Sequence, residues 1–447
     1  MRQILIRSLA STQDELTSAE VYLPGFVWRE LQAVIDCGVL DRGFVRVHCA
    51  ACQKDRLVPF SCKVRGACSS CVGRKMCELT EHLLDHVLAN VPVRQYVLTF
   101  PFPVRLLAAR DPKLLAALRR IFIRAVSAFI HKRARAKVLT KDVRTGGLCV
   151  VQRAGSALNV NPHMHALFFD GAYTRAEHGE LRFAATSEPT RQELQRLVET
   201  IATRCIRLLK RHGHVSDEQF VNPDADQTLP LFAEALSTEA SALTQTQHQT
   251  AAVNHRGFNL HAAVRISADD LAGRKRLCRY ILRPAIAQDR LSIGADGRVH
   301  YKMKRVFSDG RSVVTFTEHQ FIRRIALLIP RPKTHEITYF GALASNAKWR
   351  NAIVPVPTHR QKPKSPSASA ERPARASTSE TKLPWAELIR RTFSEDLLVC
   401  PDCGARMHVI AAITQPDLIA KILTHLDLPM LSRPARRPRA PPLLAQL

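Results

Sequence analysis

The sequence predicts an α+β protein, in which a central antiparallel sheet carries packed helices and is preceded by a small cysteine-rich module. Short β-type runs alternate with longer amphipathic segments through the middle of the chain. Two of these runs are neighbours joined by the turn-forming segment GSALNVNP, which is typical of an antiparallel hairpin. Six of the twelve cysteines fall between Cys49 and Cys77, ahead of the predicted sheet.

The predicted elements follow in chain order. Residues 1–48 are expected to be mostly helical, because apolar residues recur at helical spacing in VWRELQAVIDCGVL. Further helices are expected at 74–91, 112–137, 190–211 and 268–284. A proline ends the first and the last of these four. Strands are expected at 95–100, 148–153, 163–171 and 258–266, followed by a hairpin around Ser308-Asp309-Gly310.

Composition divides the chain into five parts. An N-terminal helical and cysteine-rich module at 1–92 precedes an α+β domain at 93–355. Within that domain, residues 213–254 are rich in Gln, Thr and Ala, show little periodicity and are interpreted as an insertion. A segment rich in Pro and Ser at 356–384 cannot bury enough apolar surface to fold and is expected to be a disordered linker. A small module at 385–430 and a basic, disordered tail at 431–447 complete the chain.

The charge balance favours a nucleic-acid partner. The 447 residues include 66 Lys and Arg against 39 Asp and Glu, a net charge of +27. A surplus of this size suits a polyanion. There is no apolar run long enough to span a membrane and no secretory signal, so a cytoplasmic protein without a membrane partner is expected.

The cysteine spacing predicts a structural zinc site. Cys49-x2-Cys52 and Cys68-x2-Cys71 are two knuckles of the kind that place four thiolates around one Zn²⁺ ion. Three nearby donors could replace one of the four or contribute to a second site, namely His48, Cys62 and Cys77. Far along the chain, Cys400 and Cys403 form half of a further possible metal site. Closing that half-site would require His408 or donors from elsewhere.

A pair of histidines indicates a second kind of metal site. His163 and His165 lie in an apolar strand, where alternation places both imidazoles on one face. Two such ligands and one more leave open positions on a divalent ion that polarises a phosphodiester. Gln152, on the preceding strand, is the favoured third ligand because its amide oxygen suits Mg²⁺ or Mn²⁺. His261 is the alternative. Another His-x-His pair, His212 and His214, has no apolar residue between its members and is interpreted as incidental.

A tyrosine downstream is the candidate nucleophile. Tyr280 shares a face of its predicted helix with Arg276 and Arg283, four residues before it and three after it. A tyrosine among cations is positioned to receive a phosphate, so the two arginines are the candidate DNA-binding residues. The alternative is a half-buried aromatic residue on an amphipathic helix.

Five motifs in this order resemble a known family: SCKVRGACSSC, VRQYVLTFP, NPHMHALFFDG, LCRYILRP and CPDCGARM. The resemblance runs from about Cys49 to Leu428. It is to the rolling-circle transposases of bacterial insertion sequences (the IS91 type), which are relatives of replication initiators and relaxases and contain an HUH endonuclease domain. The resemblance therefore implies an HUH-like fold for 93–355, with the metal ligands on a middle strand of the sheet and the tyrosine on a helix.

The resemblance also implies a mechanism and a setting. His163 and His165 would hold Mg²⁺ or Mn²⁺ against the scissile phosphate of single-stranded DNA at an element end. Tyr280 would attack that phosphate, form a 5′-phosphotyrosine link and release a 3′-hydroxyl, and the reverse attack would rejoin strands. The zinc module would help to recognise the element end. Such a transposase is expected in a bacterial cytoplasm, associated with the nucleoid.

One departure from the family concerns the number of tyrosines. Some members carry two tyrosines four residues apart, whereas Arg276 and Pro284 occupy the positions four residues from Tyr280. Either one tyrosine serves both cleavage steps, or a second copy in a homodimer supplies the other. Two rival functions remain open: a non-catalytic zinc-dependent DNA-binding protein, and a metal-dependent nuclease in which the histidines activate water.

Overall fold

The computed structural model describes residues 1–138, 140, 142–176, 179–214, 252–303, 310, 312–355 and 398–429. These residues form two compact units, each assembled from two separate stretches of chain. Unit 1 holds the described residues of 1–35 and 63–355. Unit 2 holds the described residues of 36–62 and 398–429.

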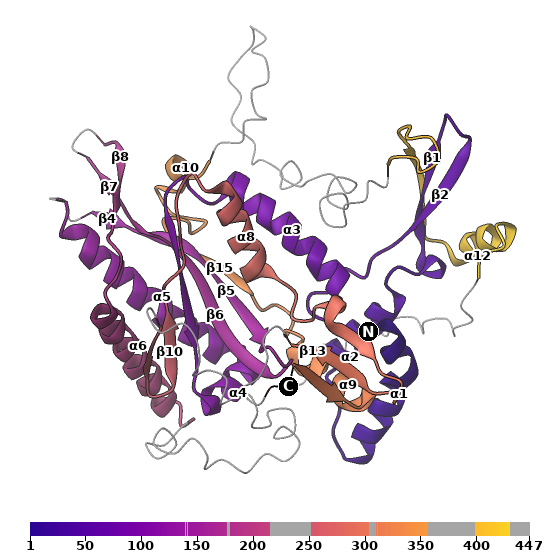
Figure 1. Ribbon diagram of the computed structural model, residues 1–447, viewed down its shortest axis with the longest axis horizontal. Coiled ribbons are helices and arrows are strands. Elements are labelled where there is room, and N and C mark those ends of the chain that lie inside the picture. Colours follow the sequence, from indigo (N-terminus) through magenta and orange to yellow (C-terminus); the bar gives the residue numbers. More distant parts are fainter. Residues whose placement is uncertain are drawn as a thin grey trace, which may run out of the picture. The chain divides into compact units, whose positions relative to one another are not determined.

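Unit 1 is built on a seven-stranded sheet (Figure 1). Strand β6 lies in the middle of the sheet, between β5 and β3, and every pairing in it is antiparallel. In spatial order the main path is β15 (Ile337–Gly341), β5 (Gly146–Ala154), β6 (Val160–Phe169), β3 (Val93–Thr99), β10 (Phe258–His261) and β9 (Ala252–His255), with β11 (Arg265–Ile266) also paired to β3.

Helices cover both faces of this sheet because β6 is apolar on both sides. Successive residues of a strand point to opposite faces. Met164 and Phe168 pack toward a core with α4 (Phe102–Arg110), α5 (Pro112–Arg135) and α6 (Arg191–Arg211). Leu167 and Phe169 pack on the other side, in the core that contains residues of α3 (Ser69–His86) and α8 (Leu271–Leu282). The strand that carries the two histidines is therefore fixed from both sides.

A buried ion pair ties three strands of this sheet together. Arg94 of β3, only 1% exposed, donates from Nε to Asp170 at 2.8 Å. It also donates to the carbonyl of Ala262, which lies between β10 and β11. Arg265 of β11 donates to the second carboxylate oxygen of Asp170 at 2.8 Å. These contacts satisfy a carboxylate that would otherwise be costly to bury.

The remaining elements of unit 1 surround the sheet. The helix α1 packs against α9, and two further three-stranded sheets are β4-β7-β8 and β12-β13-β14. In chain order these elements are α1 (Arg2–Ser18), α2 (Gly25–Asp36, whose last residue belongs to unit 2), β4 (Val143–Arg144), β7 (Gly171–Arg175), β8 (Leu181–Ala185), η5 (Gln288–Arg290), β12 (Leu291–Ile293), β13 (Val299–Lys302), β14 (Val313–Phe316), α9 (Glu318–Leu328) and α10 (Arg350–Ile353).

Unit 2 is a small three-stranded antiparallel sheet with one helix. Its central strand β1 (Phe44–Cys49) pairs with β2 (Lys54–Pro59) on one side and with β16 (His408–Ile413) on the other. The helix α12 (Pro416–His425) follows β16 and contacts the short 3-10 helix η1 (Leu40–Arg42). The buried apolar residues of this unit are few, and its main cluster is Phe44, Ile413, Ile419 and Leu423.

The predicted α+β class, with an antiparallel sheet and packed helices, is confirmed. Residues 1–48 were expected to be mostly helical, but residues 44–48 belong to the strand β1. Residues 252–254, expected within an insertion, belong to the edge strand β9. The strand expected at 258–266 is two short strands, separated where Arg94 binds the carbonyl of Ala262. The linker at 356–384, the basic tail at 431–447, most of the insertion and the turn at 308–309 lie outside the described residues.

Candidate active site and cysteine clusters

Neighbouring strands place the two histidines beside polar residues at one end of β6. In the antiparallel registers, His163 lies opposite Thr99 of β3 and Gln152 of β5. His165 lies opposite Val97, and Val97 lies opposite His261 of β10. Directly paired residues share a face of the sheet, so the registers assemble this group from four strands.

The two imidazoles contact each other and are buried. Their ring centroids are 4.9 Å apart. His163 is 9% exposed and His165 is 2% exposed. Burial lowers the pKa of His163 to about 4 and lowers the pKa of His165 well below its ordinary value. The charge of Arg283 lowers both further. Both rings are therefore neutral near pH 7, the form in which histidine binds a metal.

Hydrogen bonds fix the orientation of both rings. Nδ1 of His163 donates to the carbonyl of Asn161 at 2.7 Å, which leaves the lone pair of Nε2 available. Nδ1 of His165 lies 2.8 Å from the side-chain amide of Gln95. The amide atom nearest the ring is Nε2, which donates to Nδ1 and places the imidazole proton on Nε2 of His165. Turning this amide over, so that its oxygen accepts from Nδ1–H, gives His165 the same tautomer as His163 and makes Nε2 available to a metal. Histidines that bind metals are commonly oriented through their second nitrogen in this way.

Three buried polar atoms on this face have no hydrogen-bond partner within the described part of the chain: Nε2 of His165, Oγ1 of Thr99 and Oδ1 of Asn161. Unpartnered buried polar atoms are uncommon and often mark the place of a water or an ion. With Nε2 of His163, they surround the end of β6 with potential ligands. The residues present therefore fit a bound cation.

The helix α8 brings Tyr280 over these histidines. Asp270 caps its N-terminus by accepting a hydrogen bond from Gly273 at 2.7 Å. The buried Arg274 donates to the carbonyl of Ala89, and Lys275 pairs with Glu81 of α3 at 2.6 Å. The last residue of the helix is Leu282, two residues before Pro284. These contacts with other residues of the same chain hold the N-terminal half of the helix in place.

Tyr280 lies between a histidine and an arginine. Its ring centroid is 5.6 Å from that of His165, with the rings nearly perpendicular at 85°. The guanidinium carbon of Arg283 lies 4.5 Å from the centre of the tyrosine ring. The residue is 39% exposed, so a polymer in solution can reach it while one side of its ring contacts His165.

Gln152 connects the histidine strand to the tyrosine helix. Its Nε2 donates to the carbonyl of Tyr280 at 3.1 Å and to that of Ile281 at 2.8 Å. These carbonyls belong to the last turn of α8, where no helical partner remains for them. Gln152 therefore fixes the position of Tyr280, and its Oε1 is the atom left to bind a cation.

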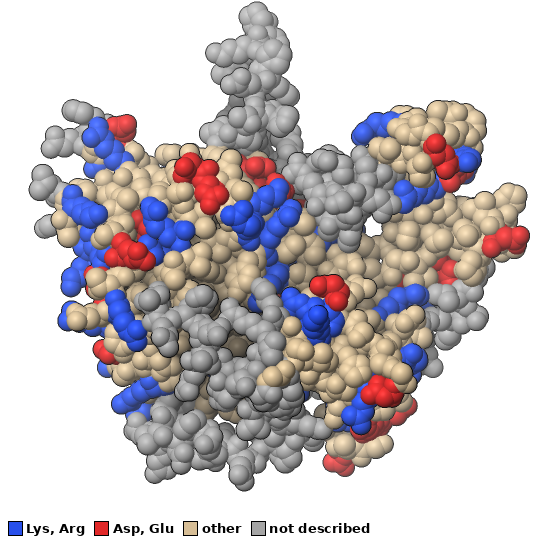
Figure 2. Space-filling view, in the orientation of Figure 1, with Lys and Arg blue, Asp and Glu red and all other residues tan. Residues whose placement is uncertain are grey.

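Positive charge accompanies the tyrosine. Arg276 is exposed on α8, one turn before Tyr280, and Arg283 caps the C-terminal end of the helix. Figure 2 shows Lys and Arg side chains on the face where Figure 1 places α8. A positive surface beside an exposed tyrosine suits the binding of a phosphate backbone.

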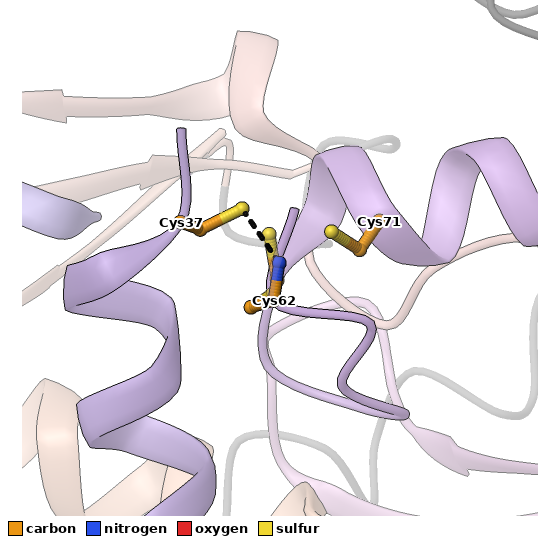
Figure 3. A group of neighbouring side chains, drawn as sticks. Cys37, Cys62 and Cys71 are labelled. Carbon is orange, nitrogen blue, oxygen red and sulfur yellow. Dashed lines mark hydrogen bonds between the residues drawn. The ribbon is translucent and has the colours of Figure 1, made fainter. Parts of the chain in front are cut away.

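The cysteines form two groups rather than the single predicted set. The first is Cys37, Cys62, Cys68 and Cys71, whose sulfurs lie within 4.8 Å of one another. Figure 3 shows three of these side chains, with the backbone N–H of Cys62 donating to Sγ of Cys37 at 3.4 Å. Cys68 precedes α3 as its N-cap residue, and Cys71 lies in the first turn.

The second group is Cys49, Cys52, Cys400 and Cys403, again with all sulfurs within 4.8 Å. The predicted zinc set of Cys49, Cys52, Cys68 and Cys71 is therefore divided between two groups. The reason is that neither pair combines with the other. Cys68 and Cys71 lie beside Cys37 and Cys62, whereas Cys49 and Cys52 lie beside the pair at the far end of the chain. None of the twelve cysteines, all of which are described, forms a disulfide.

The other proposed donors have different partners. His48 pairs with Asp55 across the β1–β2 hairpin at 2.8 Å, and His408 lies opposite His48 on β16. Cys77 is buried in α3 and belongs to neither group. Sequence reasoning missed Cys37 and Gln95. Gln95 could have been found from strand alternation, because it is a polar residue in an apolar run that ends beside the histidines.

Backbone N–H groups favour a thiolate in the second group. Those of Cys403 and Asp402 lower the pKa of the Cys400 thiol to about 7. The pKa of Cys52 is raised to about 12, foremost by its hydrogen bond with the Cys403 sulfur. One easily deprotonated sulfur among S–H donors is a typical starting point for binding a thiophilic metal.

Comparison with known families identifies the class of protein. Residues 9–100 match the family model described as "Transposase zinc-binding domain", and residues 146–350 match the one described as "Putative transposase". The chain is thus a transposase, an enzyme that acts on DNA, with a zinc-binding domain. More closely, the zinc-binding model is that of the IS91 transposases, and the chain is similar to this type.

The two matches fall on the features described above. The zinc-binding model includes all four cysteines of the first group, and the transposase model includes the histidines and the tyrosine. No curated protein and no solved structure matches the chain. Among the described residues, no helix is long and apolar enough to cross a membrane.

Proposed function

We propose that this transposase nicks and rejoins single-stranded DNA at the ends of an insertion sequence, with Tyr280 as nucleophile and a 5′-phosphotyrosine intermediate. The contact between the rings of Tyr280 and His165, 5.6 Å apart, carries the proposal. A hydroxyl nucleophile beside two neutral imidazoles suits metal-assisted attack on a phosphodiester. Strand transfer of this kind is what rolling-circle transposition requires.

His163 and His165 would bind Mg²⁺ or Mn²⁺ through their Nε2 atoms. Both rings are neutral near pH 7, and Nε2 of His165 is buried without a partner in the described residues. When bound, such an ion would polarise the scissile phosphate and stabilise its developing charge. Oε1 of Gln152 is the proposed third ligand. His261 is the alternative, because its charge contributes to lowering the pKa of His165.

The residues of the chain would perform the transfer as follows. Oη of Tyr280 loses its proton and forms a bond to the phosphorus, the bond from phosphorus to the 3′-oxygen breaks, and the leaving 3′-oxygen takes up a proton to become a 3′-hydroxyl. Gln152 holds the last turn of α8 and so keeps Oη in place. A later attack by a 3′-hydroxyl on the phosphotyrosine reverses these steps. The phosphodiester energy is retained in the link, so no nucleotide cofactor is needed.

Arg276 and Arg283 would bind the DNA strand on either side of the nucleophile. Arg283 already lies over the tyrosine ring, where its charge would face a phosphate at Oη. The net charge of +27 adds a long-range attraction that favours binding to the nucleoid. Because Tyr280 has no second tyrosine four residues away, either this tyrosine serves both cleavages in turn or a homodimer provides one nucleophile for each.

The test is incubation of the purified protein with end-labelled single-stranded DNA carrying an element end, with and without Mn²⁺, on a denaturing gel. We expect a metal-dependent band of protein joined to DNA. The variants Tyr280→Phe and His163→Ala should remove the band. The matched control is His212→Ala, since this residue belongs to the other His-x-His pair, at the end of α6, and its loss should leave the band unchanged.

Other outcomes point to other functions. Cleavage with free 5′-phosphate ends and no covalent band would indicate a nuclease that activates water. DNA binding without cleavage in any condition would indicate a non-catalytic zinc-dependent DNA-binding protein. Either result would contradict the tyrosine mechanism while leaving the family assignment intact.

A further inference from the structure

The second cysteine group joins parts of the chain that are far apart in sequence. Cys49 and Cys52 bracket the turn between β1 and β2, and Cys400 and Cys403 bracket a turn before β16. The two turns are brought together inside unit 2, where β16 pairs with β1 over residues 44–48 and 408–413. The zinc-binding family model ends at residue 100, so it does not include the second pair.

Each pair has the backbone of a zinc knuckle. In the second pair, the N–H of Gly404 donates to the carbonyl of Cys400 at 2.9 Å, and the N–H of Cys400 donates to the carbonyl of Ala405 at 2.8 Å. Gly404 has a φ of +71°, a left-handed conformation that most residues adopt only at a cost. Gln53 has a φ of +55° directly after Cys52. Both turns are therefore tight enough to point two sulfurs in one direction.

The distances between sulfurs suit zinc and do not suit disulfides. Sγ of Cys49 lies 3.6 Å from Sγ of Cys403, and Sγ of Cys400 lies 3.9 Å from Sγ of Cys52. Four sulfurs placed tetrahedrally at about 2.3 Å from one zinc ion are about 3.8 Å apart. A disulfide would require about 2.0 Å. The observed spacing is that of a tetrahedral thiolate site.

Unit 2 also has physical reasons to need a metal. Its main cluster buries only Phe44, Ile413, Ile419 and Leu423, whereas small domains with few buried residues usually depend on disulfides or metals. Lys54 beside Cys52 pairs with Asp402 at 2.7 Å, which links the two knuckles and brings a cation to the thiolates. This pair is exposed and contributes little to holding the segments together.

We propose that Cys49, Cys52, Cys400 and Cys403 bind one structural zinc ion that fastens the C-terminal segment to the N-terminal zinc-binding module. The ion would hold together two stretches of chain between which all of residues 63–355 are inserted. The C-terminal CPDCG motif is then half of a shared site, and removing it would disrupt the fold of residues 36–62. The site does not depend on the tyrosine chemistry.

The first test is the zinc content of the full-length protein, measured by elemental mass spectrometry after exhaustive dialysis. The double variant Cys400→Ser/Cys403→Ser should contain one zinc ion per chain fewer than the unaltered protein. The matched control is Cys205→Ala, because this cysteine is buried in α6 outside both groups and its loss should not change the zinc content. An unchanged zinc content in the double variant would overturn the proposal.

The second test needs no variant and so cannot be confounded by misfolding. The unaltered, zinc-loaded protein is alkylated with and without a chelator, and each cysteine is read by peptide mass spectrometry. The four proposed ligands should be protected together and become reactive together when zinc is removed, while the core residue Cys149 stays unreactive. Rapid alkylation of Cys400 and Cys403 in the zinc-loaded protein, with Cys49 and Cys52 protected, would refute the shared site.

Discussion

The seven-stranded sheet around β6 and the three-stranded sheet around β1 differ in how they are held together. The larger sheet is covered on both faces by helices and buries whole clusters of apolar side chains. The smaller sheet has a main cluster of four buried residues and a group of four thiols. A core of the first kind can hold a reactive site in place by packing alone. A unit of the second kind depends on its metal ligands, wherever in the chain they come from.

The largest expected effect that separates the two regions is that of zinc removal. Structural zinc contributes about 10 kcal/mol or more to the folding of small cysteine-rich modules. After chelation, backbone amides of β1, β2 and β16 should exchange with solvent rapidly, whereas those of β3, β5 and β6 should stay protected. Hydrogen exchange read by mass spectrometry measures both regions in one sample. Equal loss of amide protection in the two sheets would contradict the claim that only the smaller sheet depends on zinc.

The second prediction concerns the buried ion pair of the larger sheet. Asp170→Asn should destabilise the protein by about 3–5 kcal/mol, because buried Arg94 would lose its buried partner and keep only the exposed Glu188, 3.8 Å away. Denaturant unfolding measures the loss. The matched control is Glu180→Gln, which removes an exposed partner of Arg182 and should change the free energy of unfolding by about 1 kcal/mol or less.

Gln152 allows the histidine strand and the tyrosine helix to be uncoupled. Gln152→Ala removes two hydrogen bonds to the end of α8 and should slow cleavage by about 10- to 100-fold, since small displacements of a nucleophile have effects of this size. Gln152→Glu distinguishes its two roles. A carboxylate would repel the helix carbonyls but would bind Mn²⁺ more tightly, so tighter metal binding with impaired cleavage is expected if Gln152 serves both roles.

The smallest expected effect is at Arg283. Arg283→Gln should weaken binding of single-stranded DNA several-fold and lower the salt dependence of that binding by the equivalent of about one phosphate contact. Fluorescence anisotropy over a range of salt concentrations measures both quantities. An unchanged salt dependence would show that Arg283 acts only through its contact with the ring of Tyr280.

The two regions also differ in how far the sequence predicts them. Several strands and helices of the larger unit were predicted within a few residues, because alternation and helical periodicity are local signals, whereas α4, α9, β7, β8 and β12 were not predicted. β6, α6 and α8 are examples of the predicted elements. The expectation that His163 and His165 share a face agrees with the distance between their rings. The edge strand β15 was missed, since only Phe340 of its five residues is buried and such a short segment shows little periodicity.

The cysteine groups could not be assigned from spacing. Cys49-x2-Cys52 and Cys68-x2-Cys71 have the separation of a four-cysteine zinc site, yet the fold gives each pair a different partner. The partner of the first pair lies about 350 residues away, and only the pairing of β16 with β1 brings it near. Sequence spacing identifies zinc knuckles, whereas tertiary structure decides which knuckles combine.

The most direct measurement of the central claim is the identity of the residue that becomes linked to DNA. After reaction with Mn²⁺ and a single-stranded element end, the covalent product is digested with nuclease and protease and sequenced by tandem mass spectrometry. We predict a nucleotide joined through its 5′-phosphate to Tyr280. A nucleotide on any other residue, or cleaved DNA with no modified peptide, would contradict the proposed role of Tyr280.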